Sequence, residues 1–401
     1  MSRYTTELRI TRAVQLPDPV RVARCRRAPE LGPKILFFSG GTALRETCRS
    51  LVLSTHNSIH LITPFDSGGS SAVLREAFHV LAVGDLRNRL LALADRSVRG
   101  HPEVFDLFAF RFPKTGENGE LRQWLDRMIG GDDAMVAAVP DPMRKLIRNH
   151  LRFFVRKMPE SFNLRGANIG NLILVGGYLN QGRHIDPVVF LFSKLVNVRG
   201  VVRPTTSHDL HLAAELESGE VVCGQHRLTG KEADPIESPV ARLFLTDREA
   251  SGQVASTKLR GKVRDLIVSA DLICYPMGSF YSSVIANLLV GGVGQAIAEA
   301  DVPKVYVPNT TPDPEQLGMS VADQVRVLFE YSSKSAATPV NATDLIHFVL
   351  VDPDVVRISE PERRAIAALG VKVVSTPLVS EESAPLIDGE LLSSVLVSLA
   401  S

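Results

Sequence analysis

The strongest constraint on the fold is an order of segments that repeats along the 401-residue chain. A short apolar run is followed by a loop rich in Gly and Ser, and the loop leads into a helical stretch. The first unit consists of residues 35–38 (ILFF), the loop Gly40-Gly41-Thr42, and a helix expected from Ala43 to about Leu53. A short run that is apolar throughout is typical of a strand buried on both faces of a parallel sheet.

The same order returns twice more. Residues 59–63 (IHLIT) lead into the loop Asp66-Ser67-Gly68-Gly69-Ser70 and a helix to Phe78, and residues 272–275 (LICY) lead into Gly278-Ser279. Further strands are expected at 304–307, 346–350 and 371–374. Because strands alternate with helices, the sequence predicts an α/β fold, a Rossmann-like and mainly parallel sheet with helices on both faces.

Two segments depart from this order, and both are expected as insertions in one α/β domain that spans residues 34–401. Residues from about 101 to 160 have a helical pattern, and residues from about 198 to 230 alternate in β fashion around a turn at Ser218-Gly219. The chain is therefore expected to carry a helical insertion and a small β-ribbon insertion. Residues 1–33 are expected to be a solvated N-terminal arm.

One helix of the first insertion carries a basic stripe. Asp141 and Pro142 are suitable N-cap and first-turn residues for a helix over residues 143–158. Arginines recur there at every fourth position, at Arg144, Arg148, Arg152 and Arg156. A solvent-exposed face is the favoured interpretation, and an anionic partner is the alternative.

Composition limits the classes of partner. Lys and Arg number 45 against 44 Asp and Glu, a formal charge of +1, so no global field attracts nucleic acid or a membrane surface. No run reaches the roughly 18 apolar residues of a membrane span, and the N-terminus lacks the apolar core of a secretory signal. The four cysteines show no paired spacing. A cytoplasmic protein is expected, with no membrane or nucleic-acid partner, and a homodimer stays open.

Several familiar site patterns are weak or missing. The spacing His208-x-x-His211 and Cys223-x-x-His226 invites a zinc site, but a turn at Ser218-Gly219 places Cys223 opposite Ala214 and on the other face from the histidines. Asp66-Ser67-Gly68-Gly69 matches a string around the nucleophile of trypsin-like proteases, but in the wrong structural context. The sequence has no G-x-S-x-G, Walker A or H-E-x-x-H motif, so acyl hydrolysis, P-loop and zincin chemistry lose support.

The Gly- and Ser-rich loops are the strongest functional signal. Gly40-Gly41-Thr42, Gly68-Gly69-Ser70 and Gly278-Ser279 each follow a strand and precede a helix, where backbone N–H groups favour a phosphate. Ligands of parallel α/β sheets bind at that edge. Asp66 and Asp85 lie where carboxylates can hold Mg²⁺ against a diphosphate or contact a ribose or base, and helix capping is the alternative. The residues alone predict a phosphorylated ligand.

Taken together, these loops resemble a known family. SGGTALRE, FDSGGSSAVLRE, VGDLRNRLLALA, LRGANIGNLIL, LVNVRGVVRPTT, MGSFYSSVIANLLVGGVGQAIAEA, KVYVPN and SVADQV occur in the order of the phospholactate transferase superfamily. That superfamily includes the 2-phospho-L-lactate transferases of deazaflavin-coenzyme synthesis and the gluconeogenesis factor that binds UDP-N-acetylglucosamine. The resemblance runs from about Lys34 to Tyr331 and is closer to the gluconeogenesis-factor branch.

Some positions depart from the family pattern. Ala43 stands at the usual third glycine of GGTG, and Ser67 replaces the second acid of DDGGSS. Gly166-Ala167-Asn168 replaces GHS, Pro276 begins the segment that corresponds to GPGS, and residues 311–315 (TPDPE) correspond to TQPGET. Loss of one carboxylate weakens the case for Mg²⁺ and for transfer chemistry. The resemblance therefore supports ligand binding more strongly than catalysis.

The resemblance implies a nucleotide or nucleotide-sugar ligand, bound by a regulatory protein or by a transferase whose reaction is unidentified. The alternative is a phospholactate-type transferase with a guanylyl-diphosphate donor and a deazaflavin acceptor, in which Asp66, with Mg²⁺, and Asp85 are catalytic. An interaction scaffold with a decayed ligand site is the third interpretation. The residues expected at the ligand are Gly40, Gly41, Thr42, Ser67, Gly68, Gly69, Ser70, Arg75, Arg87, Asn88, Arg165, Asn168, Asn171, Gly278, Ser279 and Asn309.

Overall fold

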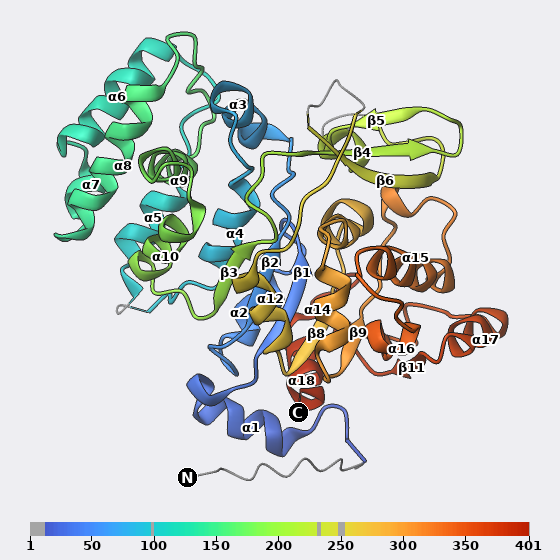
Figure 1. The fold of residues 1–401 in the computed structure, drawn as a ribbon. Helices are drawn as coiled ribbons and strands as arrows, with labels where there is room; N and C mark the ends of the chain where they lie inside the picture. The colour runs from blue at the N-terminus through green and yellow to red at the C-terminus, as the bar shows by residue number, and fades with distance from the viewer. Residues whose placement is uncertain (1–12, 98–99, 231–233, 248–252, 401) are drawn as a thin grey trace, which may run out of the picture.

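The computed structural model describes residues 13–97, 100–230, 234–247 and 253–400. Its centre is a seven-stranded parallel sheet in the order β11-β10-β9-β8-β1-β2-β3 (Figure 1). The predicted α/β class is confirmed. The strands are β1 (Ile35–Ser39), β2 (Ile59–Ile62), β3 (Val201–Pro204), β8 (Leu272–Tyr275), β9 (Lys304–Tyr306), β10 (Phe348–Val351) and β11 (Lys372–Ser375).

Strand β1 lies at the point where the chain changes direction across the sheet. Strands β2 and β3 follow on one side of β1, whereas β8 and the later strands lie on its other side. Every residue of β1, β2 and β8 is buried, which explains why their sequences are mainly apolar. The loops after β1 and β8 therefore start at the same edge of the sheet and run in opposite directions. A crevice opens between two loops of this kind, at the point where the strand order reverses.

Side chains of β1 alternate between two cores. Ile35 and Phe37 pack with α2 (Arg45–Leu51), α4 (Gly84–Ala92) and α18 (Gly389–Leu399). Leu36 and Phe38 pack with α12 (Gly261–Val268), α14 (Val293–Glu299) and α15 (Val321–Lys334) on the other face. This period of two places helices on both faces of the sheet, as predicted.

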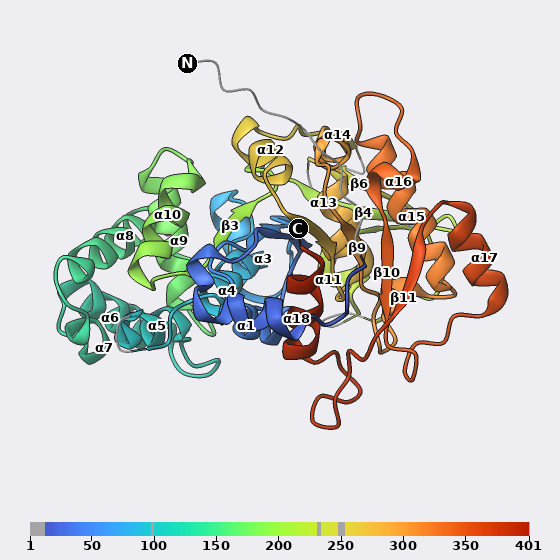
Figure 2. The same cartoon turned by 90° about the horizontal axis from the view of Figure 1, so that it is seen from below.

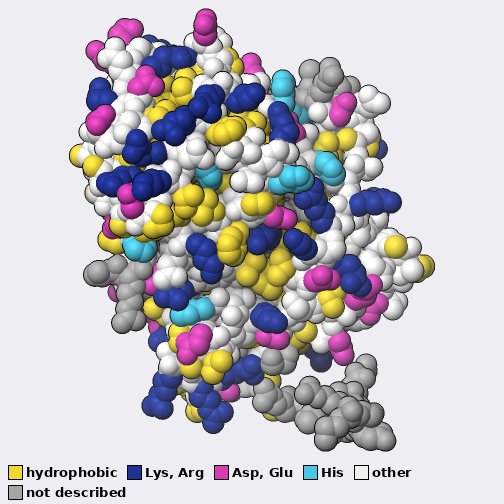
Figure 3. Space-filling model, turned by 60° about the vertical axis from the view of Figure 1, so that its left-hand side comes forward, with side chains coloured by type: hydrophobic (Ala, Val, Ile, Leu, Met, Phe, Trp, Pro, Cys, Tyr) yellow, Lys and Arg dark blue, Asp and Glu magenta, His cyan; other side chains and the backbone are white. Residues whose placement is uncertain are grey.

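The helical insertion forms a lobe beside the β3 edge (Figure 1). Helix α8 begins at Met143 as expected and ends one residue earlier than expected, at Lys157. Its N-cap is Pro142 and not Asp141, which instead pairs with Arg144 and Lys145. On the face shown in Figure 3, several Lys and Arg side chains lie close together over the upper part of this lobe. The lobe helices are α5 (Pro102–Ala109), α6 (Asn118–Gly130), α7 (Ala134–Ala138), α8 (Met143–Lys157), α9 (Ile169–Asn180) and α10 (Ile185–Leu195).

The predicted β-ribbon differs from the structure in extent and register. Residues 201–204 belong to the main sheet, and the second sheet is antiparallel in the order β5-β4-β6-β7. Cys223 faces Ala213 and not Ala214, because Leu216 pairs with Glu220 around a three-residue turn in place of the assumed two-residue turn. The strands of the second sheet are β4 (His211–Leu216), β5 (Val221–Cys223), β6 (Val240–Thr246) and β7 (Val254–Ala255).

The described part of the N-terminal segment is folded onto the domain. Helix α1 (Pro19–Arg27) is capped by Asp18, whose backbone N–H donates to Ser398 Oγ at 2.8 Å. Figure 2 shows α1 beside α18, and Arg26 pairs there with Glu390 at 2.7 Å. Residues 13–33 are therefore not a free arm; residues 1–12 of the predicted arm lie outside the described residues.

The remaining elements are short helices and the helices that have not been named above. They are η1 (Pro29–Leu31), α3 (Gly69–Phe78), α11 (Gln225–Leu228), the π-helix η3 (Phe280–Ile285), α13 (Ala286–Leu288), η4 (Pro314–Gln316), α16 (Ala342–Leu345) and α17 (Glu360–Ala368). The apolar segment that follows Gly278-Ser279 forms this π-helix together with α13. Within the described ranges, no helix combines the length and the apolar character that crossing a membrane requires.

Candidate ligand-binding site

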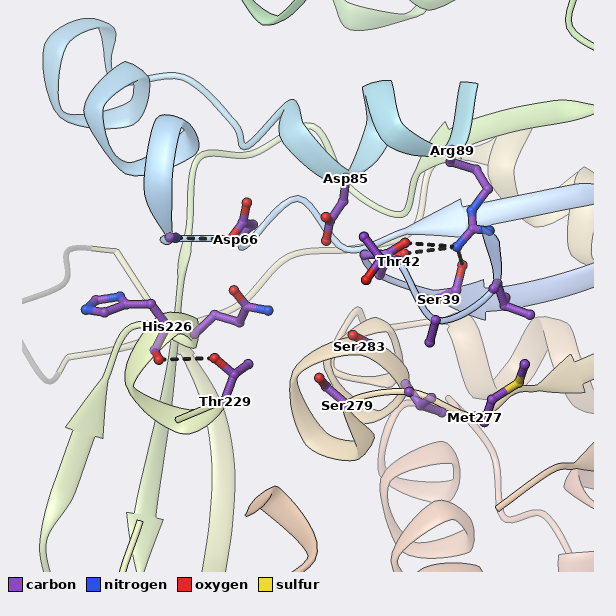
Figure 4. Close-up of a pocket in the computed structure, with 18 residues that line it drawn as sticks. Ser39, Thr42, Asp66, Asp85, Arg89, His226, Thr229, Met277, Ser279 and Ser283 are labelled. Carbon is purple, nitrogen blue, oxygen red and sulfur yellow. Dashed lines mark hydrogen bonds between the residues drawn. The ribbon is translucent and has the colours of Figure 1, made fainter. Parts of the chain in front are cut away.

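A cavity of about 350 Å³ opens at the carboxyl ends of β1, β2 and β8. The loops after these three strands meet there with the start of α4 and with α11 from the second sheet (Figure 4). This is the edge at which the Gly- and Ser-rich loops were expected to converge. The cavity is lined by Ser39, Gly40, Gly41, Thr42, Ala43, Leu44, Asp66, Gly68, Asp85, Arg89, Gln225, His226, Thr229, Met277, Gly278, Ser279, Ser283 and Val284.

The loop after β1 is closely packed and requires glycine. A Cβ atom at Gly40 would lie 2.5 Å from Ser283 Oγ, and one at Gly41 would lie 3.3 Å from Asp85 Oδ1. Contacts this short leave no room for a side chain at position 40. The loop backbone therefore lies directly between the π-helix η3 and the first turn of α4.

A buried arginine holds this loop from within the protein. Arg89 is 1% exposed, and its Nη2 donates to the carbonyl oxygens of Gly40 at 3.1 Å and Gly41 at 3.3 Å. Its Nη1 donates to Cys48 Sγ at 2.7 Å. Burial raises the pKa of Cys48, which keeps that thiol neutral. Since the hydrogen-bond partners found for Arg89 among the described residues are neutral, its positive charge favours an anion in the adjacent cavity.

The loop after β2 joins the cavity to α11. Asp66 Oδ1 accepts a hydrogen bond from Gly68 N at 3.0 Å, and Ser67 Oγ lies 2.9 Å from His226 Nδ1. His226 N also donates to Ser67 Oγ at 3.3 Å. Ser67, which stands where the family has its second acid, thus fixes the helix that brings His226 into the cavity.

Two carboxylates lie next to each other along the upper side of the cavity in Figure 4, Asp66 on the β2 loop and Asp85 in the first turn of α4. Mg²⁺ in nucleotide sites is commonly held by one or two carboxylates together with phosphate oxygens. This pair fits that limited role. Over the described ranges, no group of three or more His, Cys, Asp and Glu side chains is arranged to hold a metal ion.

The loop after β8 is already bonded to its own chain. Asn309 binds both backbone groups of Gly278, its Oδ1 accepting from the N–H and its Nδ2 donating to the carbonyl, each at 2.8 Å. Asp313 accepts from Phe280 N at 2.9 Å, and Glu315 accepts from Ser282 N at 2.8 Å. These amides at the start of η3 were expected to bind a phosphate, and they are instead taken by side chains. The side chains of Ser279 and Ser283 remain at the cavity wall.

The other predicted ligand residues lie away from this cavity. Arg75 is buried and donates to Asp209 and to three carbonyl oxygens. Gly69, Ser70, Arg165 and Asn168 line a second cavity of about 530 Å³ beside α3, where Asn171 Nδ2 donates to Ser70 Oγ. Arg87 and Asn88 line a third cavity of about 240 Å³.

Sequence reasoning missed several residues that line the main cavity, among them Arg89, Gln225, His226 and Ser283. His226 was assigned to a strand of the ribbon, so its approach to the β2 loop could not be foreseen. Arg89 lies two positions after Arg87 in the VGDLRNR segment, and on a helix these two side chains point in different directions. The helical spacing from Asp85 to Arg89 was the available signal for placing Arg89 at the cavity.

The fold and this crevice define a class: an α/β protein with a small-molecule site at the switch point of a parallel sheet. Residues 35–379 match the family described as 2-phospho-L-lactate transferase CofD. The chain is 31% identical over 300 residues to the gluconeogenesis factor of Bacillus subtilis, covering 75% of each protein. It is 27% identical over 361 residues to that of Listeria monocytogenes, covering 88% of this chain and 91% of that protein.

A solved structure has the same fold. The crystal structure of a UPF0052-family protein from Bacillus halodurans superimposes with a TM-score of 0.65 at 24% identity, over 91% of this chain and 99% of that one. The family match covers most of the chain and extends beyond Tyr331, where the resemblance read from the motifs ended. The chain therefore belongs to the CofD family, with gluconeogenesis factors among its relatives.

Proposed function

We propose that this protein binds a nucleotide or a nucleotide-diphosphate-linked ligand, such as a UDP-sugar, in the cavity at the ends of β1, β2 and β8. The observation that carries the proposal is the Gly40–Gly41 loop, held from behind by the buried cation Arg89. A phosphate beside this loop is attracted by the positive charge of Arg89.

The chemistry of the cavity supports a binder that does not depend on metal. Ser67 replaces an acid of the family and is engaged with His226, so one carboxylate fewer is available to hold Mg²⁺. The amides at the start of η3 are bonded to Asp313 and Glu315, which leaves the loop after β1 as the main anion site. We infer a regulatory role, in which the bound ligand changes the stability of the loops that line the cavity.

Thermal stability and calorimetric titration with UDP-N-acetylglucosamine, UDP, GDP and GTP, each with and without Mg²⁺, test this proposal. A ligand at 100 times its dissociation constant stabilises the native state by about 2.7 kcal/mol. We expect a response to the UDP-sugar that does not need Mg²⁺. Silence across the panel would contradict ligand binding and favour an interaction scaffold.

The second candidate function is a phospholactate-type transferase, and the two carboxylates at the cavity, Asp66 and Asp85, favour it. In such a reaction a hydroxyl of the acceptor attacks a phosphorus of the donor, and a nucleoside monophosphate leaves. Asp66 and Asp85 would orient the acceptor and hold Mg²⁺, which would supply charge neutralisation at the diphosphate. Arg89 and the Gly40–Gly41 loop would hold the leaving group.

The Asp66→Asn variant tests the transferase. If Asp66 serves transfer, the variant should lose Mg²⁺-dependent release of nucleoside monophosphate by at least 100-fold and keep most of its nucleotide affinity. Asp106→Asn, on the lobe helix α5, is the matched control. Full turnover by Asp66→Asn would remove Asp66 from the mechanism.

A further inference from the structure

We propose a second anion-binding site, separate from the loop cavity, in the third cavity between α2, α4 and α5, where three arginines would bind a phosphate monoester. The cavity holds about 240 Å³ and is lined by Arg45, Arg49, Arg87, Asn88, Leu91, Ala92, Phe105 and Ala109. The proposal does not depend on the proposed function, because it concerns different side chains and a different cavity.

The central observation is the buried guanidinium of Arg87. This residue is 7% exposed, and its only described hydrogen bond runs from Nη2 to Asn88 Oδ1 at 2.6 Å. No described residue accepts a hydrogen bond from its Nε or Nη1, both of which are buried. A buried charge without a partner is costly, so a site of this kind is completed by an anion.

The other buried arginines show how this chain normally compensates such a charge. Arg75 has a carboxylate partner, Asp209 at 2.9 Å, as well as three carbonyls. Arg89 has two carbonyls of the β1 loop. Arg87 has one neutral amide and no ion pair among the described residues. Arg89 also lacks an ion pair in the described part of the chain, but Arg87 has fewer hydrogen-bond partners than either of the other two buried arginines.

The surroundings of Arg87 add positive charge. Burial and the charges of Arg111 and Arg45 lower the pKa of Arg87 to about 10, against the opposing charge of Asp85, so the side chain stays protonated at neutral pH. Arg45 and Arg49 rise from α2 into the same cavity. Arg49 shares its charge with Glu46 at 2.8 Å, and Arg45 makes no described ion pair. A dianion matches this set better than a monoanion does.

The rest of the cavity indicates the kind of molecule that carries the anion. Leu91, Ala92, Phe105 and Ala109 form an apolar wall opposite the arginines. Arg96 stands over the Phe105 ring with 5.2 Å between its Cζ and the ring centroid, which adds a further cation near the rim. A small phosphorylated molecule with a compact carbon skeleton would satisfy both walls. The volume is about two thirds of that of the loop cavity, which favours a smaller ligand.

The two cavities are different sites with a shared wall. Asp85 and Arg89 on α4 line the loop cavity, whereas Arg87, Asn88 and Leu91 of the same helix line the arginine cavity. Their residue sets have no member in common. Helix α2, which follows the Gly40–Gly41 loop, carries Arg45 and Arg49. A ligand among the arginines would therefore contact the two helices that support the loop cavity.

Calorimetric titration with phenyl phosphate at constant ionic strength tests the site, because this probe joins a phosphate dianion to a small apolar group. The variant Arg45→Met/Arg49→Met removes two exposed arginines that the fold does not need, and we expect its affinity to fall at least 10-fold. Arg152→Met, an exposed arginine of α8 outside the cavity, is the matched control and should change the affinity less than 2-fold. Gly40→Ala, which alters the loop cavity, should also leave it unchanged.

Arg87→Met gives a second, independent readout. Because it removes a buried charge without an ion pair, we expect the unliganded variant to melt at or above the wild-type temperature and to lose stabilisation by phenyl phosphate. Absence of phenyl phosphate binding to the wild type, or equal binding by the double variant, would overturn the proposal. Loss of binding in Gly40→Ala alone would place the probe in the loop cavity and would also overturn it.

Discussion

At the scale of single residues, the candidate site depends on two close contacts around Gly40. Ser283 Oγ would lie 2.5 Å and Ser283 Cβ 3.0 Å from a Cβ at this position. The loop carbonyls are fixed from the other side by Arg89, so the backbone cannot retreat. The glycine is thus required by its neighbours and not by its backbone angles.

Gly40→Ala should weaken binding of UDP-N-acetylglucosamine at least 10-fold. The added methyl group displaces either Ser283 or the loop, and overpacking of this kind typically costs 1–3 kcal/mol. Calorimetry for the affinity and urea unfolding for the stability measure the two effects. Gly119→Ala, on α6 with nothing within 4 Å of the new Cβ, is the control and should affect neither. Wild-type affinity in Gly40→Ala would show that the ligand does not use this loop.

The residue scale also shows what sequence patterns can and cannot supply. Gly40, Asp66 and Gly278 were expected at one site because each follows an apolar run, and the structure places all three at the cavity. His226 was not expected there, because it was assigned to a strand, whereas it lies on the short helix α11. Arg87 was expected at the ligand, and its helix turns it toward a different cavity.

At the scale of elements, the π-helix η3 is held by a short acidic loop. Asp313 and Glu315 accept hydrogen bonds from the first amides of η3, and Ser282 Oγ donates to Glu315 Oε1 at 2.5 Å. Burial, together with the neighbouring charge of Asp313, raises the pKa of Glu315 to about 7. The loop that corresponds to TQPGET in the family therefore acts here as a helix cap.

This cap predicts a pH dependence of stability. At pH values between the ordinary pKa of a glutamate and about 7, Glu315 is protonated in the folded protein and deprotonated in the unfolded chain. Since the native state binds more protons in that window, the free energy of unfolding should fall as pH rises from about 4.5 to about 7. Urea unfolding across this range measures the slope.

Glu315→Gln should reduce that slope, because glutamine keeps an acceptor for Ser282 N and does not titrate. Glu360→Gln, at the exposed start of α17, is the control and should keep the wild-type slope. If Glu315→Gln and the wild type show the same pH dependence, another group is responsible for it.

The elements also differ in how well their sequences indicate them. The buried strands β1, β2 and β8 were predictable, because burial on both faces favours a mainly apolar run. Strand β6 was missed: it begins with the partly exposed Val240 and the exposed Arg242 lies within it, so no clear apolar run or alternation marks it. The register of β4 and β5 was wrong by one residue, since the turn between them holds three residues and sequence alone did not distinguish this from two.

At the scale of the whole molecule, the lobe and the sheet share one core. Side chains of α5, α8 and α9 in the lobe belong to the same buried cluster as Ile35 and Phe37 of β1 and as Leu392 of α18. Strand β1 in turn contributes Leu36 and Phe38 to the cluster on the opposite face. The insertion therefore packs as part of the domain and not as a separate unit.

Unfolding of the whole chain should accordingly be one cooperative transition. The single tryptophan, Trp124, lies on α6 in the lobe and donates to Asp133 Oδ2 at 2.8 Å, so its fluorescence reports on the lobe alone. Far-UV circular dichroism reports on all elements. We expect the two urea transitions to coincide, as they do for a two-state domain.

The variant Val395→Ala tests whether the lobe and the sheet share one core or have two independent cores. Val395 lies on α18, far along the chain from the lobe, and is 1% exposed in the cluster that the two share. Removing its methyl groups should cost about 1–3 kcal/mol and move the Trp124 transition by the same amount as the circular dichroism transition. Val73→Ala, at an exposed position of α3, should move neither. If Val395→Ala left the Trp124 transition in place, the lobe would fold independently, and ligand binding at the sheet edge could not stabilise it. Equal shifts of the two transitions would mean that a ligand in the loop cavity stabilises the lobe and the sheet together.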